Sequence, residues 1–143
     1  MRFQVIPMLL SPLILPMACH VAWTAFLYAL LTIARAPAVW GIGRRADGSN
    51  PWAMLEPRIA ANLRNQFEWP FLFYVACLLF LQQAVANHIA VVLAWIFVGG
   101  RMLHSAVQIL TGNIRLRGLV FMVNFLAVLG LWALIVQSTV AGG

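Results

Sequence analysis

The sequence has little charge and no lysine. Charged residues make up 8% of its 143 residues and hydrophobic residues make up 64%, whereas about a quarter of the residues of an ordinary soluble domain are charged. The mean hydropathy is +0.93. This composition excludes an ordinary soluble domain. A chain of this length corresponds to one domain. The composition therefore leaves no room for a separate soluble catalytic domain.

Cysteine and the common catalytic motifs are also scarce. The two cysteines, Cys19 and Cys77, lie within apolar runs and far apart in the sequence, with no CxxC motif. We therefore expect buried thiols, and neither a disulfide nor a metal site. The sequence contains no HExxH, P-loop or GxGxxG motif. Any chemistry must come from polar side chains that lie on or between apolar segments.

What the chain does have is long uncharged runs, over residues 3–34, 69–100, 102–114 and 118–143. A transmembrane helix needs about 20 apolar residues. The sequence therefore predicts an all-α integral membrane protein, a four-transmembrane-helix bundle in a single domain over 1–143. We expect helices over about 7–35, 57–84, 89–110 and 115–136, with a polar loop over 37–55.

All nine basic residues are arginines, against three acidic residues. Arginine offers a planar fork of donors that binds carboxylate or phosphate at two points. The arginines lie beside apolar spans and form no solvated basic block, so we expect no nucleic-acid partner. By the positive-inside rule, the first and third loops face the cytoplasm and both termini face away from it. The expected location is the inner membrane of a bacterium, with periplasmic termini.

Three polar clusters lie toward the same side of the expected membrane. In the first, residues 56–70, a stripe of four residues (Arg58, Asn62, Asn65, Trp69) runs beside Arg64, which is four positions before Glu68. An isolated buried carboxylate is costly, so we expect Arg64 to pair with Glu68. The other two clusters each share a helical face: Arg101, His104 and Gln108, then Arg117, Phe121 and Asn124.

In a bundle, these clusters would converge on one arginine-rich pocket with apolar walls, open to the cytoplasm. Such a pocket suits a small anionic ligand whose carboxylates meet arginine forks, beside an entrance for an apolar co-substrate from the bilayer. The alternative is that the polar pairs neutralise one another and only orient the helices.

The ordered motifs of the chain resemble those of the MAPEG family, the membrane-associated proteins of eicosanoid and glutathione metabolism. The resemblance rests on EPRIAANLRNQFEWPFLFY (residues 56–74), RMLHS (101–105) and NIRLRGLVF (113–121). It is closest to the bacterial branch of that family, which is related to microsomal glutathione transferase. It covers most of the chain from the second helix onward.

The resemblance implies a homotrimer that binds glutathione between neighbouring subunits. The position of Arg117 implies stabilisation of the glutathione thiolate, the catalytic role. The binding shell it implies consists of Arg35, Arg64, Asn65, Glu68 and His104, to which we add Gln108 and Arg115 as candidates. The implied reaction is thiolate attack on an apolar electrophile or lipid peroxide, so the implied activity is that of a glutathione transferase or peroxidase.

Four positions depart from the pattern of glutathione-using relatives. Gln108 and Phe121 stand where such relatives have tyrosine, Ala61 replaces a further arginine, and Gly118 replaces a small polar residue. Hydrogen bonds to charged groups are each worth about 1.5–3 kcal/mol, so these losses would weaken glutathione binding unless other residues, with Arg115 the candidate, compensate. The alternative function is a non-catalytic membrane scaffold or accessory subunit that retains the fold.

Overall fold

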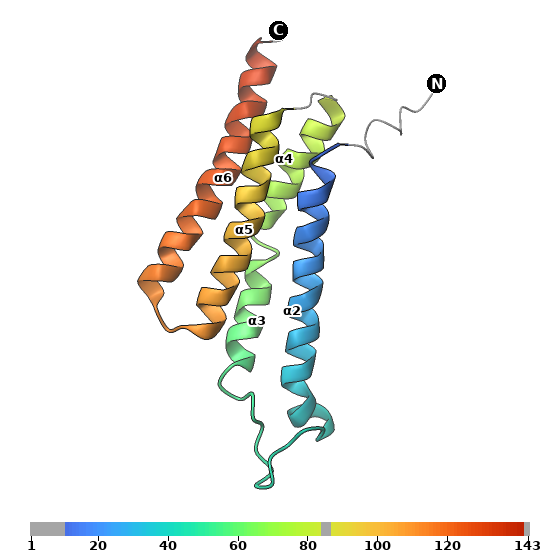
Figure 1. The fold of residues 1–143 in the computed structure, drawn as a ribbon, viewed down its shortest axis with the longest axis vertical. Coiled ribbons are helices and arrows are strands. Elements are labelled where there is room, and N and C mark those ends of the chain that lie inside the picture. The colour runs from blue at the N-terminus through green and yellow to red at the C-terminus, as the bar shows by residue number, and fades with distance from the viewer. Residues whose placement is uncertain (1–10, 84–86, 142–143) are drawn as a thin grey trace, which may run out of the picture.

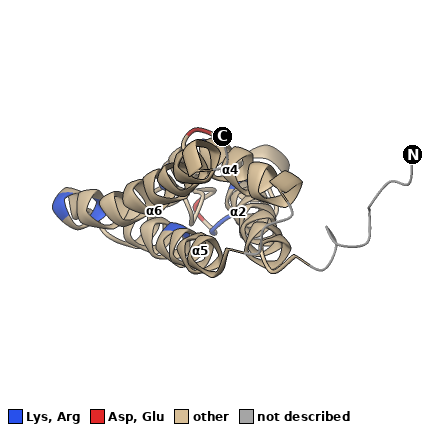
Figure 2. Cartoon of the chain, turned by 90° about the horizontal axis from the view of Figure 1, so that it is seen from above, with Lys and Arg blue, Asp and Glu red and all other residues tan. Residues whose placement is uncertain are grey.

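The computed structural model describes residues 11–83 and 87–141, and these form a bundle of long helices (Figure 1). The helices are α2 (Ile14–Trp40), α3 (Glu56–Asn65), α4 (Pro70–Gln83), α5 (His88–Leu110) and α6 (Ile114–Ala141). Figure 1 shows α3 and α4 one above the other, so that together they form the second of four columns. Seen from above in Figure 2, α5 and α6 lie side by side. The all-α four-helix architecture predicted from hydropathy is confirmed.

Three of these helices, α2, α5 and α6, are long and apolar enough to cross a membrane. Their outward faces are apolar as well: on α6, for example, Leu119, Leu126 and Val136 are more than 40% exposed. An exposed apolar face of this extent suits a lipid environment. The chain is therefore a membrane protein.

The first helix differs from its predicted range at both ends. Residues 7–10 lie outside the described part of the chain, and α2 begins at Ile14. It then continues past Pro37 to Trp40, so the predicted helix end near residue 35 and the predicted start of the loop at 37 were wrong. Gly41 ends the helix instead, with a φ of 73°, in the left-handed region that glycine adopts without strain. Arg44 supports this last turn, because its Nε donates to the Pro37 carbonyl at 2.6 Å.

The loop that follows, over residues 41–55, contains a tight polar turn. The Ser49 hydroxyl donates to Asp47 Oδ1 at 2.6 Å and the Ser49 backbone N–H donates to the same atom at 2.9 Å. These hydrogen bonds, that of the hydroxyl above all, lower the pKa of Asp47.

The second predicted helix, 57–84, is broken between Asn65 and Pro70. Pro70 has no N–H, and its ring disfavours helical geometry at the preceding residue. The end of α3 tightens accordingly, because the backbone N–H groups of Gln66 and Phe67 donate three residues back, to Leu63 and Arg64, at 3.0 Å each. Irregular backbone at membrane depth occurs where protein groups or a water-filled cavity satisfy its free N–H and C=O groups. The backbone groups freed by this break must therefore find such partners.

The last two helices agree more closely with the sequence. The helix α5 differs from its predicted range by one residue, because Asn87 caps it by accepting hydrogen bonds from the backbone N–H groups of Ile89 and Ala90. The helix α6 continues five residues beyond the predicted end at 136, to Ala141. Its last turns hold Ser138 and Thr139, whose hydroxyls both donate to the Ile135 carbonyl, so these polar side chains do not end the helix.

The interior consists of two apolar clusters with a polar layer between them. The larger cluster includes the stacked rings of Phe73 and Phe97, whose centroids are 4.2 Å apart. The smaller cluster, at the end that carries the long loop, centres on Leu27, Ile59 and Leu63. The buried polar residues between the clusters include His20, Gln66, Arg101 and Ser105.

The helices α5 and α6 approach closely where Gly100 faces Asn124. A Cβ placed on Gly100 would overlap the Asn124 side-chain oxygen, whereas a Cβ on neighbouring Gly99 would meet nothing within 4 Å. We expect Gly100→Ala to lower the free energy of unfolding by about 1–3 kcal/mol, the usual cost of overpacking. Thermal unfolding in detergent measures this.

Gly99→Ala is the matched control, and it should be neutral or stabilising by up to about 1 kcal/mol because alanine favours helix. Adding Asn124→Ala to Gly100→Ala should recover part of the loss, since it removes the overlapping atoms. Equal effects of the two glycine substitutions would contradict this account of the packing.

Candidate functional site

Gln66, the first residue after α3, is the centre of the buried polar layer. Its side-chain oxygen lies 3.2 Å from Arg101 Nε and 3.2 Å from His20 Nε2. Its side-chain nitrogen donates to Asn62 Oδ1 at 3.3 Å and to Ser105 Oγ at 3.2 Å. One amide, only 3% exposed, therefore joins α2, α3 and α5.

The directions of these hydrogen bonds follow from Arg101, which can only donate. The Gln66 atom that faces Arg101 must be the oxygen, so His20 must donate to the same oxygen from Nε2. The other ring nitrogen, His20 Nδ1, lies 2.8 Å from the Tyr74 hydroxyl. In the neutral imidazole, Nδ1 accepts from that hydroxyl. His20 is therefore a buried, hydrogen-bonded packing residue.

Arg101 is buried at 1% exposure and forms no salt bridge with a carboxylate of the described residues. Its Nη2 donates to the Asn65 carbonyl at 2.8 Å, in addition to the bond from Nε to Gln66. Within residues 11–83 and 87–141, the one salt bridge is Arg35 with Glu56, at 2.7 Å. A buried guanidinium is costly unless it is paired. The hydrogen bonds of Arg101 go to neutral acceptors, and Glu68 acts on it as a nearby charge without a salt bridge.

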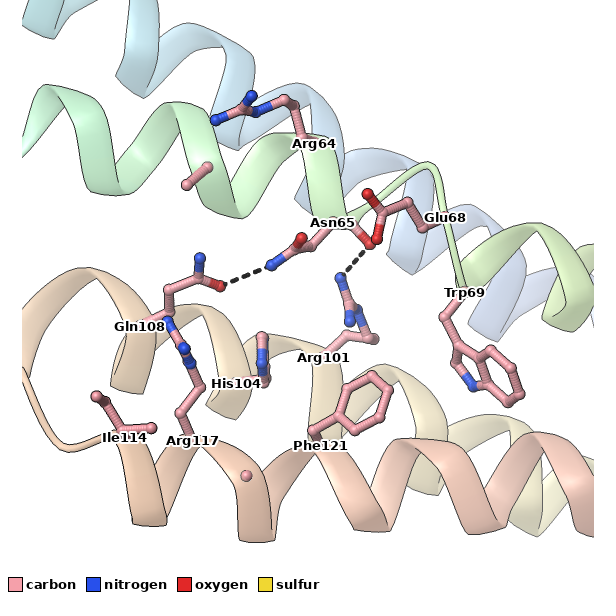
Figure 3. A pocket seen from close by; sticks show the side chains of 12 residues that line it. Arg64, Asn65, Glu68, Trp69, Arg101, His104, Gln108, Ile114, Arg117 and Phe121 are labelled. Carbon is pink, nitrogen blue, oxygen red and sulfur yellow. Dashed lines mark hydrogen bonds between the residues drawn. The ribbon is translucent and has the colours of Figure 1, made fainter.

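Beside this layer, a pocket of about 580 Å³ opens between α3, α5 and α6 (Figure 3). Three arginines line it, against one carboxylate, that of Glu68. Its lining residues are Ala61, Arg64, Asn65, Glu68, Trp69, Arg101, His104, Gln108, Ile114, Arg117, Gly118 and Phe121. We call it the arginine pocket. Its positive charge suits an anionic ligand.

The arginine pocket also has apolar walls and unused polar atoms. Trp69, stacked on Phe125 with centroids 4.9 Å apart, and Phe121 supply aromatic surface. Trp69 Nε1 and His104 Nδ1 are buried and have no hydrogen-bond partner among the described residues. Gln108 Oε1 accepts from Asn62 and Asn65 at 3.0 and 3.2 Å, so its amide nitrogen remains available to donate to a ligand.

The pocket gathers most of the site residues named from the sequence. Six of the eight candidates line it: Arg64, Asn65, Glu68, His104, Gln108 and Arg117. The other two do not. Arg35 is bound to Glu56, and Arg115 is exposed at the start of α6.

Two expected contacts are absent. Arg64 does not pair with Glu68, because the helix ends at Asn65 and the spacing of four residues no longer brings the side chains together. Figure 3 shows the Arg64 side chain directed along α3, away from Glu68. Asn124 does not face the pocket either, since it is fully buried against Gly100.

Sequence reasoning missed the role of Gln66 and the depth of Arg101. Gln66 lies one position off the predicted polar stripe. It enters the interior because the chain leaves the helix there. The signal that could have found it was Pro70, four residues later, which marks a helix break beside a run of polar residues.

Fold and site together define a helical membrane protein with an arginine-rich pocket between its helices. Residues 13–137 match the family model of the MAPEG family. Because the match covers most of the chain, the protein belongs to the MAPEG family, as the sequence resemblance implied. No curated protein matches the chain significantly, and neither does any solved structure.

We expect Gln66→Leu to lower the free energy of unfolding by about 3 kcal/mol. The substitution keeps the volume but leaves Arg101, His20 and Ser105 short of partners, and each unsatisfied buried group costs about 1–3 kcal/mol. Thermal or denaturant unfolding in detergent measures the change.

The matched control is Gln82→Leu, at an exposed position of α4, for which we expect a change within about 0.5 kcal/mol. If Gln66→Leu were as mild as this control, the polar layer would not be a main source of stability.

Proposed function

We propose that the protein is a membrane-bound glutathione transferase or peroxidase that acts on hydrophobic electrophiles or lipid peroxides from the bilayer. Members of its family typically use glutathione. The observation that carries the proposal is Arg101, a buried cation that forms no salt bridge with a described residue, in the wall of a pocket that two further arginines line. A pocket of this charge in a membrane protein is by default a functional site.

The polar groups of the pocket match the parts of glutathione. Its γ-glutamyl end carries an ammonium group, for which Glu68 is the one carboxylate in the pocket, beside an α-carboxylate that suits the donors of Arg64 and Arg101. Its thiol needs a cation that favours the thiolate, and we assign Arg117 to this role. Asn65, His104 and Gln108 complete the shell with neutral hydrogen-bonding groups.

In the transferase reaction, the thiol loses its proton to water. The sulfur then forms a bond to the electrophilic carbon, and the leaving group departs with the electron pair of the broken bond. In the peroxidase reaction, the thiolate attacks a peroxide oxygen, the O–O bond breaks, and the alkoxide takes up a proton. A second glutathione reduces the resulting sulfenic acid, giving glutathione disulfide and water.

The apolar reactant would enter across the side of the pocket that carries Trp69, Ile114 and Phe121. These side chains offer it apolar surface beside Arg117. The exposed apolar faces of the helices put this entrance in contact with lipid, so a hydrophobic electrophile or a lipid reaches the pocket without crossing water.

We further propose that the working unit is a homotrimer. Arg35 lies outside the pocket of its own subunit, and its guanidinium is bound to Glu56. The resemblance nevertheless implies that it takes part in binding, which it can do from a neighbouring subunit. Trimer assembly would thus complete the site. The arginine-bearing loops would face the cytoplasm of a bacterium, and both termini would face the periplasm.

One observation favours a second candidate, a scaffold or accessory subunit without catalysis. Gln108 and Phe121, which stand where glutathione-using relatives have tyrosine, both line the pocket. Two phenolic hydroxyls are therefore missing from the site itself. The amide of Gln108 restores one donor, whereas Phe121 restores none.

Calorimetry on the detergent-purified protein tests the proposal. We expect glutathione to bind with a dissociation constant in the millimolar range or tighter, and Arg64→Ala to weaken binding at least about tenfold, the worth of one charged hydrogen bond. Absence of binding up to several millimolar glutathione would contradict the thiol-enzyme proposal and favour the scaffold.

The assigned role of Arg117 has its own test. Arg117→Ala should abolish thiol transfer to a hydrophobic electrophile and raise the pKa of bound glutathione, seen as thiolate absorbance during a pH titration. Arg115→Ala removes the same charge two residues away but outside the pocket, and we expect it to retain activity.

The oligomeric state of both variants should match that of the unaltered protein, as measured by light scattering in detergent. A trimer that dissociates only when Arg117 is replaced would make this residue structural, and equal losses in the two variants would contradict a specific role in catalysis.

A further inference from the structure

A second hollow continues the arginine pocket toward the loop between α5 and α6. It encloses about 280 Å³ and is lined by Pro57, Arg58, Val107, the loop residues 111–113 and four residues that it shares with the arginine pocket: Ala61, Gln108, Ile114 and Arg117. The two hollows share these four walls and therefore lie side by side, and we treat them as the two halves of one groove. We call the second hollow the outer pocket.

The groove follows one face of α3. Residues Arg58, Ala61 and Asn65 succeed one another at spacings of three and four, which places them on one side of a helix, and all three line the groove. From Arg58 to Asn65, the helix rises about 10 Å. An extended tripeptide spans about the same length, at roughly 3.5 Å per residue.

The charges along this groove are ordered. Glu68 lines only the arginine pocket, Arg117 lines both hollows, and Arg58 lines only the outer pocket. No carboxylate lines the outer pocket within the described residues. The groove thus has a carboxylate toward one end, a cation where the hollows meet and a second cation toward the other end. It suits a ligand with the complementary charges in that order: one cationic group followed by two anionic groups.

Arg58 is held in place but retains free donors. Its Nη1 donates to the Ile109 carbonyl in the last turn of α5 at 3.4 Å, its one hydrogen bond to a described residue. This contact anchors the guanidinium at the side of the outer pocket. A guanidinium has five N–H groups, so most of them remain available to a carboxylate in the groove.

We propose that Arg58 binds the second carboxylate of an elongated dianionic thiol, and that Ala61 keeps the passage to it open. The inference rests on the proposed use of glutathione and extends it by giving the ligand a direction. The γ-glutamyl ammonium lies at Glu68, the thiol lies near Arg117 where the two hollows meet, and the glycyl carboxylate meets Arg58. A longer side chain at position 61 would divide the groove, since Ala61 lines both hollows.

The test compares glutathione with its ethyl ester, in which the glycyl carboxylate is esterified. Binding of each is measured by calorimetry on the full chain in detergent. We expect the unaltered protein to prefer glutathione by about tenfold or more, the worth of one charged hydrogen bond. In Arg58→Gln, this preference should disappear. If Arg58→Gln only disturbed the structure, it would weaken the binding of both ligands equally and leave the preference for glutathione intact.

The matched control is Arg45→Gln, which removes the same charge from an exposed arginine of the loop over residues 41–55, outside both hollows. It should keep the preference. If Arg58→Gln keeps the preference as well, or if the unaltered protein binds both ligands equally, the role of Arg58 is overturned while glutathione binding stands. If neither ligand binds the unaltered protein, the proposed function fails and the inference fails with it.

The passage at Ala61 is tested by a shorter ligand. Ala61→Leu should weaken the binding of glutathione by about tenfold or more. It should affect the binding of γ-glutamylcysteine much less, because that dipeptide lacks the glycyl residue that passes position 61. Equal weakening of both ligands would contradict the proposed direction of binding.

Discussion

Much of the structure depends on the buried side-chain amide of Gln66, whose oxygen accepts hydrogen bonds from two donors in the bundle interior. Both Arg101 and His20 direct a nitrogen at the Gln66 oxygen, and no water is present in a bilayer core to replace it. The amide can reach them only because the chain leaves the helix after Asn65. The break that Pro70 causes is thus the way in which α2, α3 and α5 are tied together between two apolar clusters.

The same interaction positions the candidate site. Gln66 fixes Arg101, which lines the arginine pocket, and the bond from Arg101 to the Asn65 carbonyl holds the end of α3 beside it. The ligand would therefore meet a cation that is already oriented, so binding would not have to order a long side chain. Arg101 thus belongs both to the stabilising layer and to the wall of the candidate ligand site.

Hydropathy predicted the helices well and the irregularities poorly. The uncharged runs indicated the four columns because burial in lipid depends mainly on composition and length. The break at Pro70 and the continuation of α2 through Pro37 depend instead on what satisfies the freed backbone groups, which composition does not contain. For the site, helical spacing brought Asn65, His104 and Gln108 together correctly. It failed for the pair of Arg64 and Glu68, whose spacing assumed an unbroken helix.

The fixed hydrogen-bond directions around Gln66 restrict how this sequence can change. Arg101 imposes the orientation of the amide, the amide imposes the tautomer of His20, and Ser105 accepts from both Gln66 and Trp23 while donating to the Arg101 carbonyl. A single substitution at any of these positions leaves a donor or acceptor stranded in the membrane interior. A substitution at one of these positions is tolerated only with a compensating substitution at another. Positions 20, 66, 101 and 105 should therefore co-vary as a unit among related sequences, even where no ligand touches them.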